Sequence, residues 1–272
     1  MLCSCRRLEQ FRKALQYRRS ECRAPSDDAV FGVDNLYSKS SPPFAASEQS
    51  GRQRRVLYAK IVESGVDIVC VETTVTKVIA DISMSLDGFV TGPEPDIEHG
   101  LGRGGEPLHA WAFDKGSEVD AEVLREAVEA TGSVVMGRRL FDFVDGSHGW
   151  DDNVGYGAQH ATLPPVLVVT HRAPDAVRLA PRFSFVTDGL SSAIIEARAA
   201  AGAKDVFVMG GAEVVRRCVE LGLADELRIH LAPVVLGSGT PLFKDGPSRQ
   251  LVQRSVRSSR QATHITYEVK SG

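Results

Sequence analysis

The sequence predicts an α/β protein whose largely parallel sheet is covered by helices on both faces. Two observations support this prediction. From Lys77 onward, short apolar runs alternate with amphipathic segments, the pattern of strands joined by helices in a parallel sheet. Residues 263–269 instead alternate between polar and apolar side chains with a period of two, which predicts an antiparallel edge at the C-terminal end.

The first part of this domain is predicted to contain one long strand and two helices. The strand covers 78–84 and leads through a turn at Asp87-Gly88 into a short second apolar run at Phe89-Val90. Residues 92–105 hold five glycines and two prolines and show no periodicity, so they are expected to form a long loop, often a functional lid. Helices are predicted for 107–113 and 118–131, the second because its apolar residues share one face and a glycine follows it.

The remaining elements follow from the same patterns. Strands are predicted at 134–136, 166–170, 183–186, 206–209, 227–231, 233–236 (as a continuation of the preceding strand), 250–257 and 263–269. Helices are predicted at 138–143, 190–201 and 212–221.

The chain is expected to divide near residue 75. Residues 1–55 are rich in Arg and Ser, and no apolar core pattern follows the short amphipathic stretch at their start. We therefore predict a poorly ordered basic extension over 1–75 and a folded domain over 76–272. An organelle-targeting peptide and a start codon assigned too far upstream are the alternatives for the extension.

Composition excludes several classes of function. The formal net charge of the 272 residues is −3, which gives no reason to expect a nucleic-acid partner. No apolar run approaches the roughly 18 residues expected of a membrane span. The five cysteines include Cys3-x-Cys5, but no second pair follows at zinc-site spacing, so neither a metal site nor a disulfide framework is expected. A reducing, cytoplasmic location fits this cysteine usage.

Two glycine turns are the strongest candidates for a ligand site. The strand at 206–209 runs into Gly210-Gly211, and a helical pattern begins at once at Ala212. Glycines let the backbone approach a bulky anion, and the free N–H groups at a helix start can bind it. We therefore predict a pyrophosphate site in this turn, with Gly210, Gly211 and Ala212 as the binding backbone and Met209 and Glu213 at its borders. Glu213 is expected to be a favourable helix-start acid rather than a catalyst.

The second turn, Gly137-Arg138-Arg139, adds fixed positive charge. Guanidinium groups bind phosphate bidentately and stay charged at any working pH. The two arginines are predicted to select the 2′-phosphate of NADP, with solvated helix-start residues as the alternative. Thr170 and His171, after the next strand, are expected beside the 2′-phosphate or the adenine ring, with an exposed loop histidine as the alternative for His171. In an open α/β sheet such turns meet at the carboxyl ends of the strands, so all three are expected to share one crevice.

The usual dinucleotide fingerprint, G-x-G-x-x-G after the first strand, is absent at that position. The glycine-rich segment 100–105 follows a loop rather than a strand, so it does not supply the motif. This observation argues against an ordinary Rossmann dehydrogenase and favours another α/β nucleotide-binding fold.

Five segments in order resemble the dihydrofolate reductase superfamily, in the branch shared with the reductase domain of bacterial riboflavin biosynthesis. They are Ile82–Phe89, Val135–Arg139, Leu167–Thr170, Val208–Glu213 and Val234–Phe243. The resemblance covers about 76–270. It implies a dihydrofolate-reductase-like three-layer fold with a twisted sheet of about eight strands, NADPH as cofactor, hydride transfer to a small heterocycle, and a homodimer.

The resemblance also implies roles for individual residues. Ala80 and Ile82 would line the nicotinamide through their backbone, and Asp87 and Gly88 would belong to a mobile loop over the active site. Asp87 is the only acid that the motifs place near the reacting ring, so it is the candidate proton donor; a local turn-capping role is the alternative.

Trp111 and His230 are the candidate substrate-binding residues, with a buried strand histidine as the alternative for His230. True dihydrofolate reductases carry an acid in their first helix. Aligning Trp111 with the tryptophan of that helix puts Leu108 at the acid's position, so reduction of dihydrofolate itself is not expected.

The sequence thus predicts an NADPH-dependent reductase of a small heterocycle, with a riboflavin-pathway ribosylamino-pyrimidine as candidate substrate. No zinc deaminase signature lies upstream, so the bifunctional riboflavin enzyme is not expected. The alternative is a non-catalytic NADP-binding relative with a regulatory role.

Overall fold

The computed structural model describes residues 47–50, 53–62, 65–74, 76–114, 116–147, 149–151, 155–156, 163–244 and 246–270. The chain divides into two compact units, and the larger one contains everything from Cys70 onward. The strands β1 (Ser47–Ser50), β2 (Gln53–Val62) and β3 (Gly65–Thr74) form a small sheet in the order β1-β2-β3. The sequence analysis expected no strands there. The basic start of the predicted extension lies outside the described residues, and its boundary at residue 75 stays a prediction.

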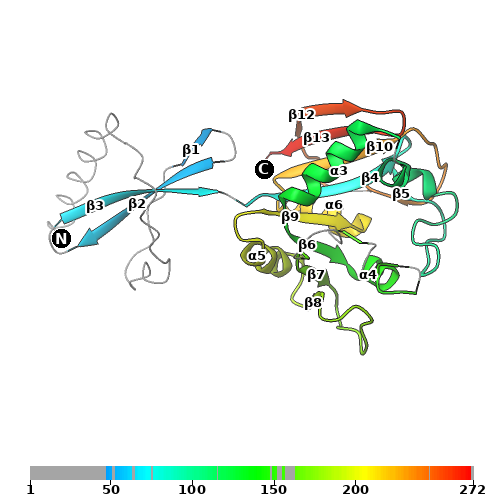
Figure 1. The fold of residues 1–272 in the computed structure, drawn as a ribbon, viewed down its shortest axis with the longest axis horizontal. Helices are drawn as coiled ribbons and strands as arrows, with labels where there is room; N and C mark the ends of the chain where they lie inside the picture. Colours follow the sequence, from blue (N-terminus) through cyan, green and yellow to red (C-terminus); the bar gives the residue numbers. More distant parts are fainter. Residues whose placement is uncertain are drawn as a thin grey trace. The chain divides into compact units, whose positions relative to one another are not determined.

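The main sheet has eight strands in the order β12-β13-β10-β4-β9-β6-β7-β8 (Figure 1). They are β4 (Val78–Ser85), β6 (Thr131–Gly137), β7 (Val166–Val169), β8 (Phe183–Val186), β9 (Asp205–Gly210), β10 (Glu226–Ala232), β12 (Leu251–Ser258) and β13 (Thr263–Val269). The six from β10 to β8 are parallel, whereas β13 pairs antiparallel with β10, and β12 with β13. The predicted fold class, including the antiparallel C-terminal edge, is confirmed.

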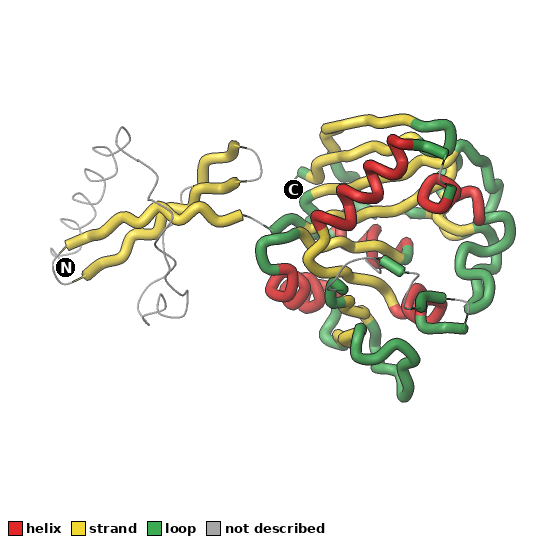
Figure 2. Tube along the Cα trace, in the orientation of Figure 1, coloured by secondary structure: helices red, strands yellow, loops and turns green. Residues whose placement is uncertain are grey.

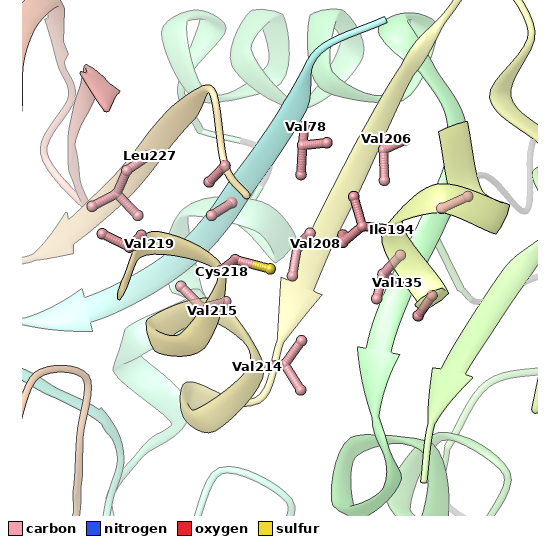
Figure 3. Close-up of a cluster of buried hydrophobic side chains, with 14 of the residues drawn as sticks. Val78, Val135, Ile194, Val206, Val208, Val214, Val215, Cys218, Val219 and Leu227 are labelled. Carbon is pink, nitrogen blue, oxygen red and sulfur yellow. The ribbon is translucent and has the colours of Figure 1, made fainter. Parts of the chain in front are cut away.

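Helices cover both faces of this sheet (Figure 2). Apolar residues of α5 (Leu190–Ala201) and α6 (Ala212–Glu220) pack with Val78 and Ala80 of β4 in one core cluster. Figure 3 shows part of this cluster, with Cys218 of α6 among valines of the central strands. Ile79, which points the other way from β4, packs with Ala127 of α3 (Glu118–Ala130). The alternation of side chains along β4 therefore supplies both cores.

The opposite face also carries α4 (Arg138–Val144) and a short segment formed by η2 (Glu106–His109) and α2 (Ala110–Phe113). The helix predicted at 107–113 is thus a 3₁₀ turn followed by one α-helical turn. Phe141 of α4 packs with residues of β6 and β7. Within the described part of the chain, no helix has the length and apolar character needed to cross a membrane.

The predicted strand continuation at 233–236 is wrong. Strand β10 ends at Ala232, because Pro233 has no N–H to extend the ladder. The backbone that follows bonds to the turn after β4 instead: Leu86 donates to the carbonyl of Val234, and Leu236 and Gly237 donate to Asp87. A short pairing of β5 (Phe89–Thr91) with β11 (Thr240–Pro241), which the sequence analysis did not predict, lies farther along the same two segments.

The sheet opens between its two central strands. β4 pairs with β10 from Ile79 to Ser85, but with β9 only from Val78 to Ala80. Beyond Ala80, therefore, one side of β4 has no ladder with its neighbour. This opening lies toward the carboxyl ends of the parallel strands, where ligands bind in open α/β sheets.

Candidate functional site

The three predicted ligand turns lie at one edge of the sheet. Strands β9, β6 and β7 are adjacent and parallel. The turns that follow them, at Gly210, Gly137 and Thr170, therefore leave the sheet side by side. We call this edge, together with the opening between β4 and β9, the carboxyl-edge crevice.

The two glycine turns approach each other closely. A Cβ atom added at Gly137 would lie 2.9 Å from Cγ2 of Val214 and 3.8 Å from the backbone nitrogen of Gly211. Gly210 has a φ of +129°, which side chains rarely adopt, and its peptide bond to Gly211 is cis. A Cβ added at Gly211, by contrast, would meet nothing within 4 Å. Gly137 therefore allows the turns to pack together, while Gly211 faces open space.

The residues that flank Gly210 and Gly211 have local packing roles as well. Met209 packs against the core cluster on the α4 face, and Ala212 is buried at the start of α6. The exposed Glu213 forms an ion pair with Arg216 one turn later. Glu213 is therefore a helix-start acid with a partner of its own.

The two arginines of the second turn differ. The Nε of Arg138 donates to Asp142 at 2.7 Å, and its Nη1 donates to the backbone carbonyl of Arg172 at 2.8 Å. Arg139 is exposed and has no hydrogen bond or ion pair among the described residues. Arg138 is thus fixed between α4 and the loop after β7, and Arg139 is the arginine available for a ligand.

Thr170 and His171 also differ. Thr170 is buried, and its hydroxyl donates to the same Arg172 carbonyl, at 2.8 Å. It therefore shapes the loop that Arg138 holds from the other side. His171 is exposed, with no side-chain hydrogen bond within the described residues, so it is free to contact a ligand at this edge.

Ala80 and Ile82 lie on either side of the point where the sheet opens. Ala80 is fully buried and is the last residue of β4 paired with β9, while Ile82 is partly buried and lies beyond that pairing. Their position borders the crevice, as the backbone contact with a nicotinamide ring would require.

Asp87 ties the turn after β4 to the segment after β10. Its carboxylate accepts from the Ser85 hydroxyl at 2.7 Å and from the backbone N–H groups of Leu236 at 3.1 Å and Gly237 at 2.7 Å. The hydrogen bond from Ser85 is the main reason that its pKa is lowered. Gly88 adopts a φ of +90° in this turn. The geometry therefore makes Asp87 an ionised acceptor that closes the turn, the alternative role that the sequence left open.

Trp111 and His230 belong to one buried cluster. Their ring centroids are 4.1 Å apart, and the indole N–H of Trp111 donates to the Ser83 hydroxyl at 2.9 Å. His230 does not stand alone: its Nε2 lies 3.0 Å from Oδ1 of Asp81, and its Nδ1 lies 2.7 Å from Nδ1 of His264. The Nε2 of His264 lies 2.7 Å from Oδ1 of Asp120.

These four groups form a continuous chain, Asp81–His230–His264–Asp120, which we call the histidine chain. It runs from β4 through β10 and β13 to the first turn of α3. His230, His264 and Asp120 are at most 5% exposed. The second carboxylate oxygens of Asp81 and Asp120 are buried and have no hydrogen-bond partner among the described residues.

The surroundings of the chain shift three pKa values. Burial opposes ionisation of Asp81, but attraction and hydrogen bonding from His230 outweigh it, so the pKa of Asp81 is lowered. Burial lowers the pKa of His264 more than its bond with Asp120 raises it. His109 of η2 lies nearby, and burial followed by the charge of His230 lowers its pKa to about 4. Asp81 is therefore held ionised, and His264 and His109 are held neutral.

A polar pocket of about 220 Å³ adjoins the chain. Asp81, His230 and His264 line it together with charged residues of α3, β10 and β12. It is large enough for several water molecules.

Three members of the chain, Asp81, His264 and Asp120, were not predicted from the sequence. Asp120 reads as an ordinary helix-start acid behind the Ser117 cap, and His264 reads as one position of an alternating edge strand. Leu108, which the alignment placed at the acid's position, is fully buried. A buried acid does occur in the first turn of a helix, as Asp120 of α3. The signal available in the sequence was the single Asp inside the otherwise apolar run of β4.

Comparison with known proteins agrees with this architecture. A putative riboflavin biosynthesis protein from Shewanella sp. PV-4 superimposes with a TM-score of 0.54 at 22% identity, covering 72% of this chain and 100% of that protein. RibD from Acinetobacter baumannii gives a TM-score of 0.50 at 14% identity, over 72% of this chain and 58% of RibD. The uncharacterized protein YyaP of Bacillus subtilis (strain 168) is 23% identical over 180 residues, which are 64% of this chain and 83% of YyaP.

The fold is thus an α/β architecture similar to that of RibD and of a putative riboflavin biosynthesis protein. The RibD C-terminal domain family matches residues 76–266, and the chain belongs to that family.

Proposed function

We propose that this protein is an NADPH-dependent reductase that transfers a hydride to a small heterocyclic substrate. The observation that carries the proposal is the arrangement of the two glycine turns. Gly211 faces open space, and the turn packed against it carries Arg139, which has no partner among the described residues, at the edge where the sheet opens. An anion-binding backbone and a free guanidinium are what the phosphates of a dinucleotide require.

The residues fit such a cofactor. The space beside Gly211 would be filled by any side chain's Cβ, so a glycine there keeps room for a pyrophosphate. Arg139, which has no partner within the described part of the chain, would pair with the 2′-phosphate, and His171 would lie beside it. Ile82 would border the nicotinamide. When bound, NADPH supplies the hydride.

The chain's own residues would bind and orient the reactants. Arg138 and Thr170 both donate to the Arg172 carbonyl and so fix the loop that bounds the phosphate side. Asp87 holds the turn after β4 against the segment after β10. This arrangement would place an acceptor ring against the nicotinamide and replace a chance encounter with an aligned one.

We propose a C=N- or C=O-containing heterocycle as the acceptor, with the ribosylamino-pyrimidine of riboflavin biosynthesis as the first candidate because of the family to which the chain belongs. The resemblance also leads us to propose a homodimer in solution.

The second candidate function is NADP binding without turnover. One observation favours it: the carboxylate of Asp87, the acid that the motifs place near the reacting ring, already accepts three hydrogen bonds and is not placed to donate a proton. Incubating the purified full-length protein with NADPH and a panel of pyrimidine and pteridine acceptors, while following loss of the reduced nicotinamide absorbance, separates the two. Substrate-dependent oxidation supports the reductase. Binding of NADPH with no oxidation across the panel supports the binding protein.

A further inference from the structure

The histidine chain holds one more proton than its four groups would carry separately. A neutral imidazole has one donor nitrogen and one acceptor nitrogen, and an ionised carboxylate only accepts. The chain has three close contacts, Asp81–His230, His230–His264 and His264–Asp120, and each needs one proton. Two neutral histidines supply two. At 2.7 Å, the two Nδ1 atoms without a proton between them would place lone pair against lone pair, so a third proton is required.

The third proton lies either on His230 or on the carboxyl group of Asp120, because both arrangements satisfy the three contacts and give the same net charge. In the first arrangement, which the proposal below adopts, His230 carries both of its protons. Nε2–H then donates to Asp81, Nδ1–H donates to His264, and His264 donates to Asp120. His230 is the imidazolium in a chain of net charge −1.

The charges around His230 are consistent with this assignment. The titratable groups that face it from the packed elements are Asp81 of β4, Glu226 and Arg228 of β10, Arg257 of β12, His264 of β13, Asp120 and Glu126 of α3, and His109 of η2. Glu226 pairs with Arg228 and Glu126 with Arg257. Neither Asp81 nor Asp120 forms an ion pair with an arginine among the described residues, although Arg228 lies close enough to help lower the pKa of Asp81. One buried cation between the two acids is therefore balanced.

One end of the chain lies at the point where the sheet opens. Asp81 directly follows Ala80, where β4 parts from β9. Its Oδ2 has no partner among the described residues, and the residue lines the polar pocket. Asp81 is thus the member through which a proton can leave the chain, and water in the pocket can return one.

We propose that the histidine chain is the internal acid of this protein, with Asp81 as the group that delivers a proton stored on His230. The proposal rests on the proposed reductase function. When a hydride adds to the carbon of the acceptor's C=N bond, the π electron pair moves to nitrogen. A proton then passes from Nε2 of His230 to the Asp81 carboxylate and from Asp81 to that nitrogen, and a proton from solvent restores the chain. The two electrons that reduce the acceptor would come with the hydride that bound NADPH would supply.

The proton count is tested without turnover, by ¹⁵N NMR of histidine-labelled full-length protein at a pH about one unit above the ordinary imidazole pKa of roughly 6.5. Signals are assigned with His230→Gln and His264→Gln. We expect both ring nitrogens of His230 to be protonated in the wild type. We expect His230 to become neutral in Asp81→Asn, which keeps the acceptor oxygen but removes the charge. The matched control is Asp96→Asn, which alters an exposed Asp–His pair elsewhere and should leave the His230 signals unchanged.

The use of the proton is tested by the rate of NADPH oxidation with an acceptor from the panel. Asp81→Asn should lower kcat at least tenfold with little change in KM, and should shift the pH profile, whereas Glu196→Gln on the exposed side of α5 should not. A neutral His230 in the wild type overturns the proposal. So does an imidazolium whose loss in Asp81→Asn leaves kcat and the pH profile unchanged. Absence of NADPH binding would instead refute the proposed function, and the proposed use of the proton with it, while the spectrum still decides the proton count.

Discussion

The carboxyl-edge crevice and the histidine chain are built in different ways. The crevice consists of turns whose residues are consecutive in sequence, such as Gly137-Arg138-Arg139, and its features are backbone shape and free charge. The histidine chain draws one residue from each of β4, β10, β13 and α3, and its features are buried side-chain contacts. A site made of turns can be read and altered locally, whereas a site made of side chains from distant segments exists only once the fold is formed.

The largest effects are expected at the two crevice glycines, because Gly211 leaves room for a ligand and Gly137 lets the two turns pack together. Gly211→Ala places a methyl group in open space, so we expect stability to change by less than about 1 kcal/mol but NADPH affinity to fall about a hundredfold, or ~3 kcal/mol. Gly137→Ala forces a contact with Val214 and should lower the free energy of unfolding by about 1–3 kcal/mol. Urea unfolding and calorimetric titration measure both. If the two variants lost affinity and stability to the same extent, the assignment of Gly211 to ligand binding and of Gly137 to packing would be wrong.

The next largest effect should be a difference between the two arginines, in NADPH affinity and in stability. Arg139→Ala removes a group with no partner among the described residues, so we expect NADPH affinity to fall about tenfold to a hundredfold with no change in stability or in the weaker binding of NADH. Arg138→Ala breaks the bonds to Asp142 and Arg172 and should lower both stability and affinity. If Arg138→Ala alone weakened NADPH binding, Arg138 would be the phosphate ligand.

The pH dependence of the free energy of unfolding should report on His109, beside the buried histidine chain. The pKa of His109 is lowered to about 4 in the folded state, so between about pH 6.5 and pH 4 the unfolded chain binds a proton that the folded chain does not. The stability that depends on neutral His109 is therefore complete above pH 6.5 and is lost as the pH falls toward 4, by on the order of 1–3 kcal/mol. In urea unfolding at several pH values, His109→Gln should show a correspondingly weaker loss. Identical pH dependence in both proteins would mean that His109 is not held neutral.

The smallest effect is expected at Asp87. Asp87→Asn keeps one acceptor oxygen but weakens the bonds to the backbone N–H groups of Leu236 and Gly237. We expect the unfolding temperature to fall by a few degrees at most and the pH profile of turnover to keep its shape. Loss of one limb of that profile would restore Asp87 as the proton donor.

Much of the fold could be predicted because its signals are local. Glycines after apolar runs marked the turns at Gly137 and Gly210, and the two-residue period of 263–269 marked the antiparallel edge. The segment 233–236 was misread because its apolar side chains resemble a strand, although Pro233 cannot extend the ladder. The histidine chain could not be predicted because it depends on register: His230 meets His264 and Ser83 only through the pairing of β10 with β13 and β4.

The most direct test of the account is a calorimetric titration of the full-length protein with NADPH and with NADH, alongside the same titrations of Gly211→Ala and Arg139→Ala. The account predicts that the wild type prefers NADPH, that Gly211→Ala binds neither nucleotide well, and that Arg139→Ala loses the preference while still binding NADH. Absence of binding by the wild type, or an unchanged preference in Arg139→Ala, would contradict the assignment of the carboxyl-edge crevice as the nucleotide site.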